Sequence, residues 1–358
     1  MLPFLATSLG LSLQPPRVFE CATVMYGQES YKVKLQQQVT PCALPPVVLV
    51  PPLGVGIDSS FYNRLLEEWG ALGAPATMHA PDLLGTGSAS PKPRRFYAPE
   101  VWAGQLQAYI AEHVGEPCVL VVQGGLLPCA LEIWRASGTN AVAGMTLLSP
   151  PPRRFFTPET AVPDSATPRR RAQRIAWAVA NSPVGNLFFR RLRGGRPRGK
   201  RIRAFSEASL FAGAADDEWV DQCVAGARDA RGRFATFSYL AGSIPAGGAW
   251  RDDRAALFES LDVPVQLLRG DYGGLANAIA RAEEFLQHTP RPCRRTSAVI
   301  FGARACVPYE RAAPTARLLA EFLELHFGAG SDVAGEDSGA EFIRLPGDST
   351  SCESLTAD

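Results

Sequence analysis

The chain alternates short, wholly apolar runs with longer segments whose apolar residues recur at helical spacing. The apolar runs match strands that are covered on both faces, and they cover 46–50, 117–122, 142–148, 264–268 and 297–301. The segments with helical spacing cover 59–69, 99–113, 126–134, 253–261, 275–288 and 312–327. This order predicts an α/β fold in which helices pack on both faces of a mainly parallel sheet.

Three regions depart from this alternation. Residues 18–39 have the period of a β-hairpin, and 328–358 form an acidic, glycine- and serine-rich tail that we expect to be disordered. Residues 150–250 are rich in proline and arginine, with helical character, and we interpret them as a cap over the carboxyl edge of the sheet. The predicted organisation is an N-terminal arm, a core in two parts around the cap, and the tail, with bounds 1–17, 18–149, 150–250, 251–327 and 328–358.

Composition narrows the class of protein. The net charge of +1 gives no global field that would attract nucleic acid, so nucleic-acid binding is not expected. Eight cysteines are scattered without C-x-x-C spacing, which is typical of free thiols in a reducing compartment. The N-terminus lacks the basic region of a signal peptide, so we expect an intracellular protein that is not secreted. The sequence contains no cofactor or metal motif, and it leaves the oligomeric state open.

Several motifs resemble the α/β-hydrolase superfamily. Residues 81–88, P-D-L-L-G-T-G-S, are similar to its P-D-x-x-G-x-G-x-S turn shortened by one residue, and 302–310 resemble the loop that carries its catalytic histidine. Residues 51–56, 121–128 and 149–151 resemble more narrowly a subgroup found in cyanobacteria and plastid-bearing organisms. The resemblance covers 18–327 and implies the α/β-hydrolase fold with a helical cap insertion, in a plastid or the cytoplasm.

The family's nucleophile lies on a strained strand-to-helix turn of the form G-x-S-x-G. The matching turn reads V-Q-G-G-L, so the nucleophile position falls on Gly124, between the large residues Val122 and Leu126. A shift of one residue brings in Gln123 or Gly125, and neither is a nucleophile. The residues therefore exclude covalent catalysis from this turn, while a glycine is compatible with its positive φ.

The other two triad positions also lack the expected residue types. The resemblance places the histidine at Ala305, with Cys306 beside it, and the acid at Gly273, with Asp271 nearby. Because a triad acts as a unit, this pattern predicts a degenerate site. The four histidines lie elsewhere and are expected to be surface or helix-end residues; they are His79, His113, His288 and His326.

A binding site is compatible with the loss of the triad. An oxyanion hole is made of backbone N–H groups, and the resemblance assigns this role to Leu53 and Gly125. We expect Gly54, Leu126 and Ser149 to line the cleft, although the bulk of Leu126 could instead fill it. A rebuilt nucleophile, either Ser149 or Cys306 with Asp271, is conceivable, but no base accompanies it.

The predicted cap carries a basic stretch. Twelve arginines and lysines fall within 169–203, which contain no acidic residue, and aromatic residues are interleaved with them. This combination suits an anionic membrane surface. The predicted contact residues are Phe188, Phe189, Arg190, Arg191 and Arg193. The alternative is a solvated face balanced by the acidic tail.

Three functions remain open at this stage. The first is a non-catalytic hydrolase-fold protein that binds an apolar or amphipathic small molecule, or a protein partner. The second is a hydrolase of lipid-like or small carboxylic esters that uses non-standard residues. The third is a peripheral membrane or assembly factor that uses the basic cap.

Overall fold

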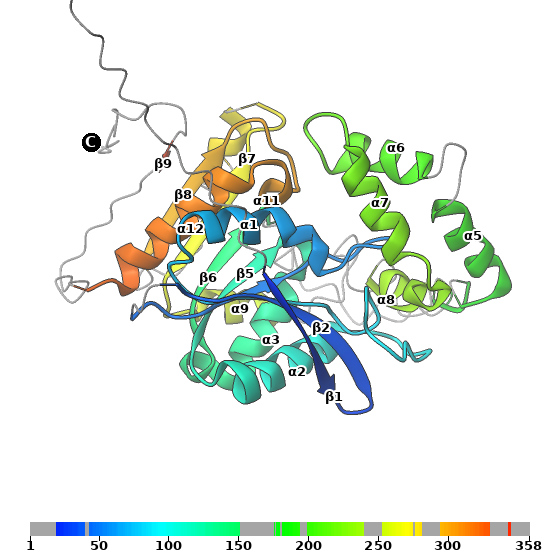
Figure 1. Cartoon of the computed structure of the whole chain (residues 1–358), viewed down its shortest axis with the longest axis horizontal. Coiled ribbons are helices and arrows are strands. Elements are labelled where there is room, and N and C mark those ends of the chain that lie inside the picture. The colour runs from blue at the N-terminus through cyan, green and yellow to red at the C-terminus, as the bar shows by residue number, and fades with distance from the viewer. Residues whose placement is uncertain are drawn as a thin grey trace, which may run out of the picture.

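The chain forms one nine-stranded sheet with helices on both faces (Figure 1), as given by a computed structural model. The structure describes residues 19–39, 43–150, 175, 177–179, 181–193, 199–239, 253–274, 276–280, 294–329 and 343–344. The strands are β1 (Glu20–Tyr26), β2 (Glu29–Gln36), β3 (Val47–Val50), β4 (Met78–Pro81), β5 (Cys118–Gln123), β6 (Val142–Leu148), β7 (Val265–Gly270), β8 (Arg295–Ile300) and β9 (Ile343–Arg344).

The strand order confirms a mainly parallel sheet. The order is β1-β2-β4-β3-β5-β6-β7-β8-β9, and every neighbouring pair from β4 onward is parallel. The predicted hairpin is β1 and β2, which pair antiparallel to each other, and β2 also pairs antiparallel with β4. Because β3, β4, β5, β6, β7 and β8 run in one direction, the loops after them meet at one carboxyl edge.

The helices follow the predicted segments closely. In the core they are η1 (Ser59–Tyr62), α1 (Asn63–Ala71), α2 (Pro99–Tyr109), the π-helical η2 (Ile110–Val114), η3 (Gly124–Leu126), α3 (Leu127–Ser137), η4 (Gly138–Asn140), α9 (Asp253–Glu259), α11 (Val307–Glu310) and α12 (Ala312–Phe327). The predicted helix over 275–288 lies mostly outside the described residues, of which 276–280 are helical.

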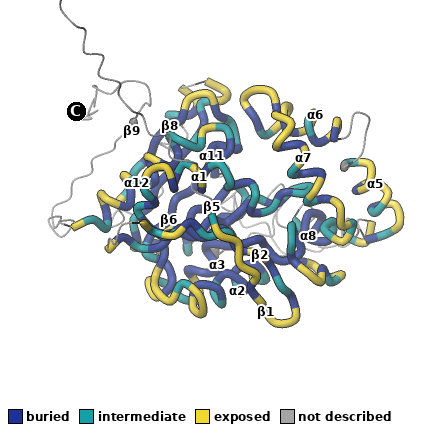
Figure 2. The backbone as a smooth tube through the Cα atoms, in the orientation of Figure 1, coloured by how far each residue is buried: buried dark blue, intermediate teal, exposed yellow. Residues whose placement is uncertain are grey.

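Two apolar cores lie on the two faces of the sheet. Along β5, Leu120 and Val122 belong to the core beside α2 and α3, whereas Val119 and Val121 belong to the core beside α1 and α12. Successive strand residues point to opposite faces, so both parities must be apolar when both faces are covered. This explains why β5 is a continuous apolar run. Figure 2 shows that the central strands of the sheet are buried.

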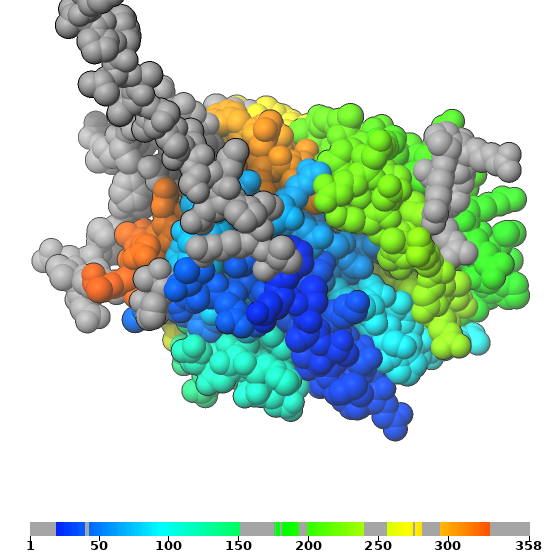
Figure 3. All heavy atoms as spheres, viewed as in Figure 1, coloured from blue at the N-terminus to red at the C-terminus, as the bar shows by residue number. Residues whose placement is uncertain are grey.

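The described residues between β6 and α9 form a group of helices outside the sheet (Figure 1), and these residues lie at one end of the molecule, in green in Figure 3. We call these residues (175, 177–179, 181–193 and 199–239) the insertion. It contains α5 (Pro183–Arg193), α6 (Lys200–Ser209), α7 (Asp217–Gly226), η6 (Ala230–Gly232) and α8 (Arg233–Ser238).

The remaining predicted segments are described only in part. The arm over 1–17 lies outside the described residues, and so does most of the tail over 328–358, within which Ile343–Arg344 pairs with β8 as β9. None of the helices in the described residues combines the length and the apolar character needed to cross a membrane.

The insertion is held against the loops at the carboxyl edge. Thr236 donates a hydrogen bond to the carbonyl oxygen of Gly54 after β3 (3.1 Å), and the Tyr97 N–H donates to the Ser238 hydroxyl (2.9 Å). On the other face, Arg64 of α1 forms ion pairs with Asp216 (2.7 Å) and Glu218 (2.5 Å). The insertion therefore contacts several separate loops of the core.

Candidate functional site

The parallel strands bring the predicted site residues to one edge. Val50 pairs with Val122 and Gln123 with Leu148, so the residues that follow β3, β5 and β6 are neighbours. Gly270 pairs with Ile300, which places the loops after β7 and β8 beside each other. Residues far apart in the chain thus converge, namely Leu53, Gly124, Gly125, Ser149, Asp271 and the loop 302–306.

Gly124 has the backbone of a tight strand-to-helix turn. It follows β5 directly, begins η3, and has a φ of +51°, in the left-handed region. A Cβ atom at this position would meet only the carbonyl oxygen of Ser149, at 3.8 Å, apart from its chain neighbours. The turn predicted from the glycines is therefore present, and there is room where a side chain would start.

The space beside Gly125 is filled by a side chain of the insertion. A Cβ atom on Gly125 would lie 1.8 Å from the hydroxyl oxygen of Tyr239, which follows α8. Burial raises the pKa of Tyr239 to about 12, so its phenol stays protonated at neutral pH and can donate a hydrogen bond. A hydroxyl group thus reaches the β5 turn from the insertion rather than from the turn itself.

Three polar side chains at the strand ends hold the loop 302–306. Gln123 Nε2 donates to the carbonyl oxygen of Ala305 (2.5 Å), and Ser149 Oγ donates to that of Arg304 (3.2 Å). Asp271 Oδ1 accepts a hydrogen bond from the Gly302 N–H (2.8 Å). Gln123, Ser149 and Asp271 are therefore engaged in positioning the loop that the resemblance assigned to the histidine.

Two residues at this edge have an unfavourable feature, an unpaired buried acceptor in one and a strained backbone in the other. Gln123 Oε1 is buried and accepts no hydrogen bond from a described residue, and the contact of Nε2 with a carbonyl fixes which end of the amide is the oxygen. Ser149 has a φ of +45°, which is rare for a residue with a side chain. A buried acceptor without a donor and a strained backbone both mark functional positions more often than ordinary scaffold.

The oxyanion-hole residues retain the required donors. Leu53 lies three residues beyond Val50, as Gly125 lies three beyond the paired Val122. Gly125 is in the first helical turn after β5, where backbone N–H groups have no acceptor within the helix. Both positions can therefore direct N–H groups toward the edge of the sheet.

The conceivable nucleophile Cys306 and the predicted cleft residue Leu126 are both buried in the core. Cys306 is 3% exposed and packs with Tyr62 and Val307, and burial raises the pKa of its thiol well above the ordinary value. Leu126 is also buried, in the core beside α3. The position of Leu126 agrees with the alternative that its bulk fills space, and the burial of Cys306 disfavours it as a nucleophile. Gly273 is exposed, with a φ of +95°.

The expectation of a surface or helix-end position is wrong for His79, on β4, whereas His326 does lie in the last turn of α12. Both side chains are buried, and burial lowers the pKa of each to about 4. His79 Nδ1, on β4, contacts the hydroxyl of Tyr109, on α2, at 2.8 Å. His326 is near the far end of α12, about 20 Å along the helix from Ala312, at 1.5 Å per residue. His113 lies in η2, and His288 is outside the described residues.

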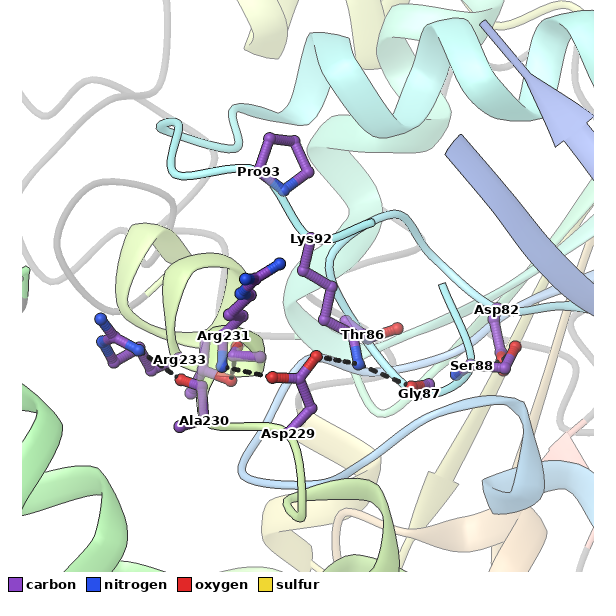
Figure 4. A network of polar contacts seen from close by, with 12 residues as sticks. Asp82, Thr86, Gly87, Ser88, Lys92, Pro93, Asp229, Ala230, Arg231 and Arg233 are labelled. Carbon is purple, nitrogen blue, oxygen red and sulfur yellow. Dashed lines mark hydrogen bonds and ion pairs between the residues drawn. The ribbon is translucent and has the colours of Figure 1, made fainter. Parts of the chain in front are cut away.

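The turn after β4 is a second polar cluster at the same edge, part of which Figure 4 shows. Asp82 accepts hydrogen bonds from the Ser59 N–H (2.9 Å), from the Ser88 N–H (3.0 Å) and from the Ser88 hydroxyl. Lys92 Nζ donates to the Gly87 carbonyl oxygen (2.8 Å) and pairs with Asp229 of the insertion (3.4 Å). The motif at 81–88 therefore stabilises its own loop, and through Gly87 it also positions Lys92 for the ion pair with the insertion.

A further carboxyl group in this cluster was not predicted. Asp58 Oδ1 accepts from the Ser60 N–H (2.8 Å), and burial, with a further contribution from the Asp82 carboxylate, raises the pKa of Asp58. Lys34 donates to Asn63 (2.8 Å), and burial lowers the pKa of Lys34. Nothing local in the sequence indicated Asp58 or Tyr239, because their neighbours come from distant segments. Among the described residues no three potential metal-binding side chains gather into one cluster.

The predicted membrane-contact residues differ in how far their side chains are buried. Phe188 is 53% exposed, and Arg190 and Arg191 are also exposed. Phe189 is buried against Phe237, at 5.9 Å between ring centroids, so its prediction as a contact residue is wrong. Adjacent helical residues point about 100° apart, which is why Phe188 and Phe189 differ. The side chain of Arg193 lies outside the described residues.

Solved structures with a similar backbone are α/β-hydrolases. A haloalkane dehalogenase loop variant, DbeA-M1 from Bradyrhizobium elkanii, aligns with a TM-score of 0.61 and 17% identity over 86% of this chain and 97% of its own. A thermophilic esterase from Thermogutta terrifontis aligns with a TM-score of 0.54 and 18% identity, over 86% of this chain and 98% of its own. The serine hydrolase CarC, which is involved in carbazole degradation, aligns with a TM-score of 0.59 and 15% identity, over 86% of this chain and 100% of its own. The chain therefore has the α/β-hydrolase fold. No protein-family model and no curated protein sequence matches it.

Proposed function

We propose that this protein is a non-catalytic member of the fold that binds an apolar or amphipathic small molecule at the β5 turn, beneath the insertion acting as a cap. The observation that carries the proposal is Gly124, whose left-handed backbone matches the position of a nucleophile while its side chain is absent. A glycine offers no atom that could form a covalent intermediate. The triad positions Ala305 and Gly273 likewise lack an imidazole and a carboxylate.

The groups around the turn favour binding over reaction. The Tyr239 hydroxyl, a donor, lies against Gly125, the residue after Gly124, and the residue before Gly124 carries the acceptor Gln123 Oε1, which has no described partner. A neutral molecule with both a hydroxyl or amide N–H and a carbonyl would satisfy these groups together. A buried polar site gains most of its selectivity from such pairing, because an unmatched ligand leaves the protein groups without partners.

The groups that an alternative hydrolase would need are engaged elsewhere. Ser149 Oγ donates to a carbonyl, Asp271 accepts from a backbone N–H, and the Cys306 thiol is buried and protonated. The three described histidines belong to β4, η2 and α12. A hydrolase of lipid-like or small esters would have to activate Ser149 without a neighbouring base.

Catalysis is tested with a fluorophosphonate probe and a series of short- and long-chain acyl esters. We expect no labelling and no turnover from the natural chain. The double variant Gly124→Ser with Ala305→His should gain labelling, and Gly124→Ser alone should label far less, because the hydroxyl then lacks a base. Turnover by the natural chain that Ser149→Ala abolishes would establish the alternative hydrolase instead.

Binding is tested with 1-decanol and N-decylacetamide as amphipathic probes. We expect each to raise the midpoint of thermal unfolding, and Tyr239→Phe to weaken binding about fivefold, the effect of one hydrogen bond. Tyr97→Phe is the matched control, because its hydroxyl contacts Pro93 rather than the β5 turn. Equal affinities for the natural chain and Tyr239→Phe would contradict a site at this turn.

A further inference from the structure

The helix α5 has two apolar faces: one is buried against the protein, and the other is more than half exposed, although Phe188 on it also stacks on Phe237 with ring centroids 6.2 Å apart. Gly185 and Phe189 are buried on the inner face. On the outer face, Val184 is 67% exposed and Leu187 and Phe188 are each 53% exposed. These three residues have the i, i+3, i+4 spacing that forms one stripe on a helix. A stripe of this kind on a surface helix calls for a partner.

Exposed apolar side chains are concentrated in this part of the molecule. Of the thirteen large hydrophobic residues that are exposed among the described residues, six lie between 175 and 205. Besides the α5 stripe they include Phe205 on α6, which is 62% exposed. Phe205 follows Arg201 by four residues and so shares one face of α6 with it. The other seven are spread between Met25 and Phe96 and between Tyr272 and Leu325.

Positive charges that form no ion pair with any described residue border this apolar surface. Arg190 and Arg191 lie in the last turn of α5, and Lys200 and Arg201 are the first two residues of α6. An Arg201 guanidinium N–H donates to the carbonyl oxygen of Arg191 (3.2 Å), so the two helix ends are adjacent. None of these four cations has an ion pair with a described residue, although Arg203 on the same helix pairs with Asp217. Like charges so arranged favour an anionic partner.

We propose that the outer face of α5 and the start of α6 form a docking surface for an anionic lipid bilayer. The apolar stripe would enter the boundary between headgroups and acyl chains, while the cations contact the lipid phosphates and carboxylates. Nucleic acid would use the same charges but not the stripe, because aliphatic side chains such as Val184 and Leu187 neither stack on bases nor hydrogen-bond to them. The mixture of apolar and basic groups therefore favours lipid.

The full chain is tested by flotation with phosphatidylcholine vesicles, with and without phosphatidylserine, at low and high salt. We expect association only with the vesicles that contain phosphatidylserine, and its loss at high salt. The variant Arg190→Gln with Arg191→Gln should bind about thirtyfold more weakly, which is the fold-change expected for the loss of two basic residues at the membrane surface. Leu187→Ser should bind about tenfold more weakly, because the stripe loses an inserting side chain.

Matched controls separate this surface from general hydrophobicity. Met25→Ser and Leu325→Ser remove side chains that are 59% and 55% exposed on β1 and α12, and both should bind vesicles like the natural chain. Unchanged thermal midpoints would show that all variants fold. The proposal is overturned if the natural chain does not float with anionic vesicles or if Leu187→Ser floats equally well. It is also overturned if duplex DNA or RNA competes vesicles off.

Discussion

Two turns at the carboxyl edge of the sheet, after β4 and after β5, differ in how their polar groups are used. In the β4 turn Asp82 accepts three hydrogen bonds, and a Cβ atom on Gly87 would lie 2.5 Å from that of Asp58. In the β5 turn a Cβ atom on Gly124 would meet one distant carbonyl, and Gln123 Oε1 has no partner.

The difference separates scaffold from site. A turn whose donors and acceptors are all paired, and whose glycines are crowded, resists substitution because each change leaves an unpaired group or a collision. A turn with spare room and an unpaired acceptor can accommodate a ligand. The same fold therefore contains both kinds of turn about 10 Å apart, since β3 lies between β4 and β5 in the sheet.

The largest effect is expected from Asp82→Ala. This change leaves the Ser59 N–H, the Ser88 N–H and the Ser88 hydroxyl without their acceptor, and we expect a loss of about 4 kcal/mol in the free energy of unfolding. Ser149→Ala, beside the β5 turn, removes one hydrogen bond and should cost about 1 kcal/mol. Urea denaturation measures both, and equal losses would remove the distinction between the turns.

A matched pair of glycine substitutions sharpens the comparison. Gly87 and Gly124 both have positive φ, +39° and +51°, so alanine strains the backbone at either position. At Gly87 the new methyl group also collides with Asp58 and Asp82, and we expect a loss of about 3 kcal/mol. At Gly124 only the backbone term remains, about 1 kcal/mol. Thermal or urea unfolding of the two variants measures both losses of stability. A larger loss for Gly124→Ala than for Gly87→Ala would contradict the comparison.

The contact between Gly125 and Tyr239 predicts energetic coupling between the β5 turn and the insertion. Gly125→Ala places a methyl group where the Tyr239 hydroxyl lies, and we expect it to cost about 2 kcal/mol of stability. In a chain that already carries Tyr239→Ala, the same change should cost little. A double-mutant cycle of unfolding free energies measures the coupling. Additive effects would show that the side chain of Tyr239 does not occupy this space.

The smallest effect concerns the charge of Asp58 and its dependence on pH. The pKa of Asp58 is raised in the folded chain, so its contribution to stability is complete below the unfolded pKa and is lost as pH rises through the folded pKa. Asp58→Asn keeps an acceptor for Ser60 and removes the charge. We expect the variant to be more stable by about 1 kcal/mol at pH 7. The difference should shrink toward zero at pH 4 and below; a constant difference would exclude the titration of Asp58 as its cause.

Local patterns in the sequence determined the fold class and several features of the site. The apolar runs predicted the strands because a strand covered on both faces needs apolar residues at both parities. The paired glycines predicted a positive-φ turn after β5, and the structure confirms it at Gly124. The gathering of Leu53, Ser149 and Asp271 at one edge also follows from strand order, because parallel strands end on the same side.

Only the tertiary structure decided which polar groups are satisfied. Gln123, Ser149 and Asp271 all contact the loop 302–306, and the hydroxyl beside Gly125 belongs to the insertion. His79 looked like a surface residue at a strand end, yet it is buried against Tyr109. A residue's own neighbours in the chain fix its backbone preference and its side of the sheet. Its hydrogen-bond partner and its burial depend on segments far away, whose approach is set only when the whole domain packs.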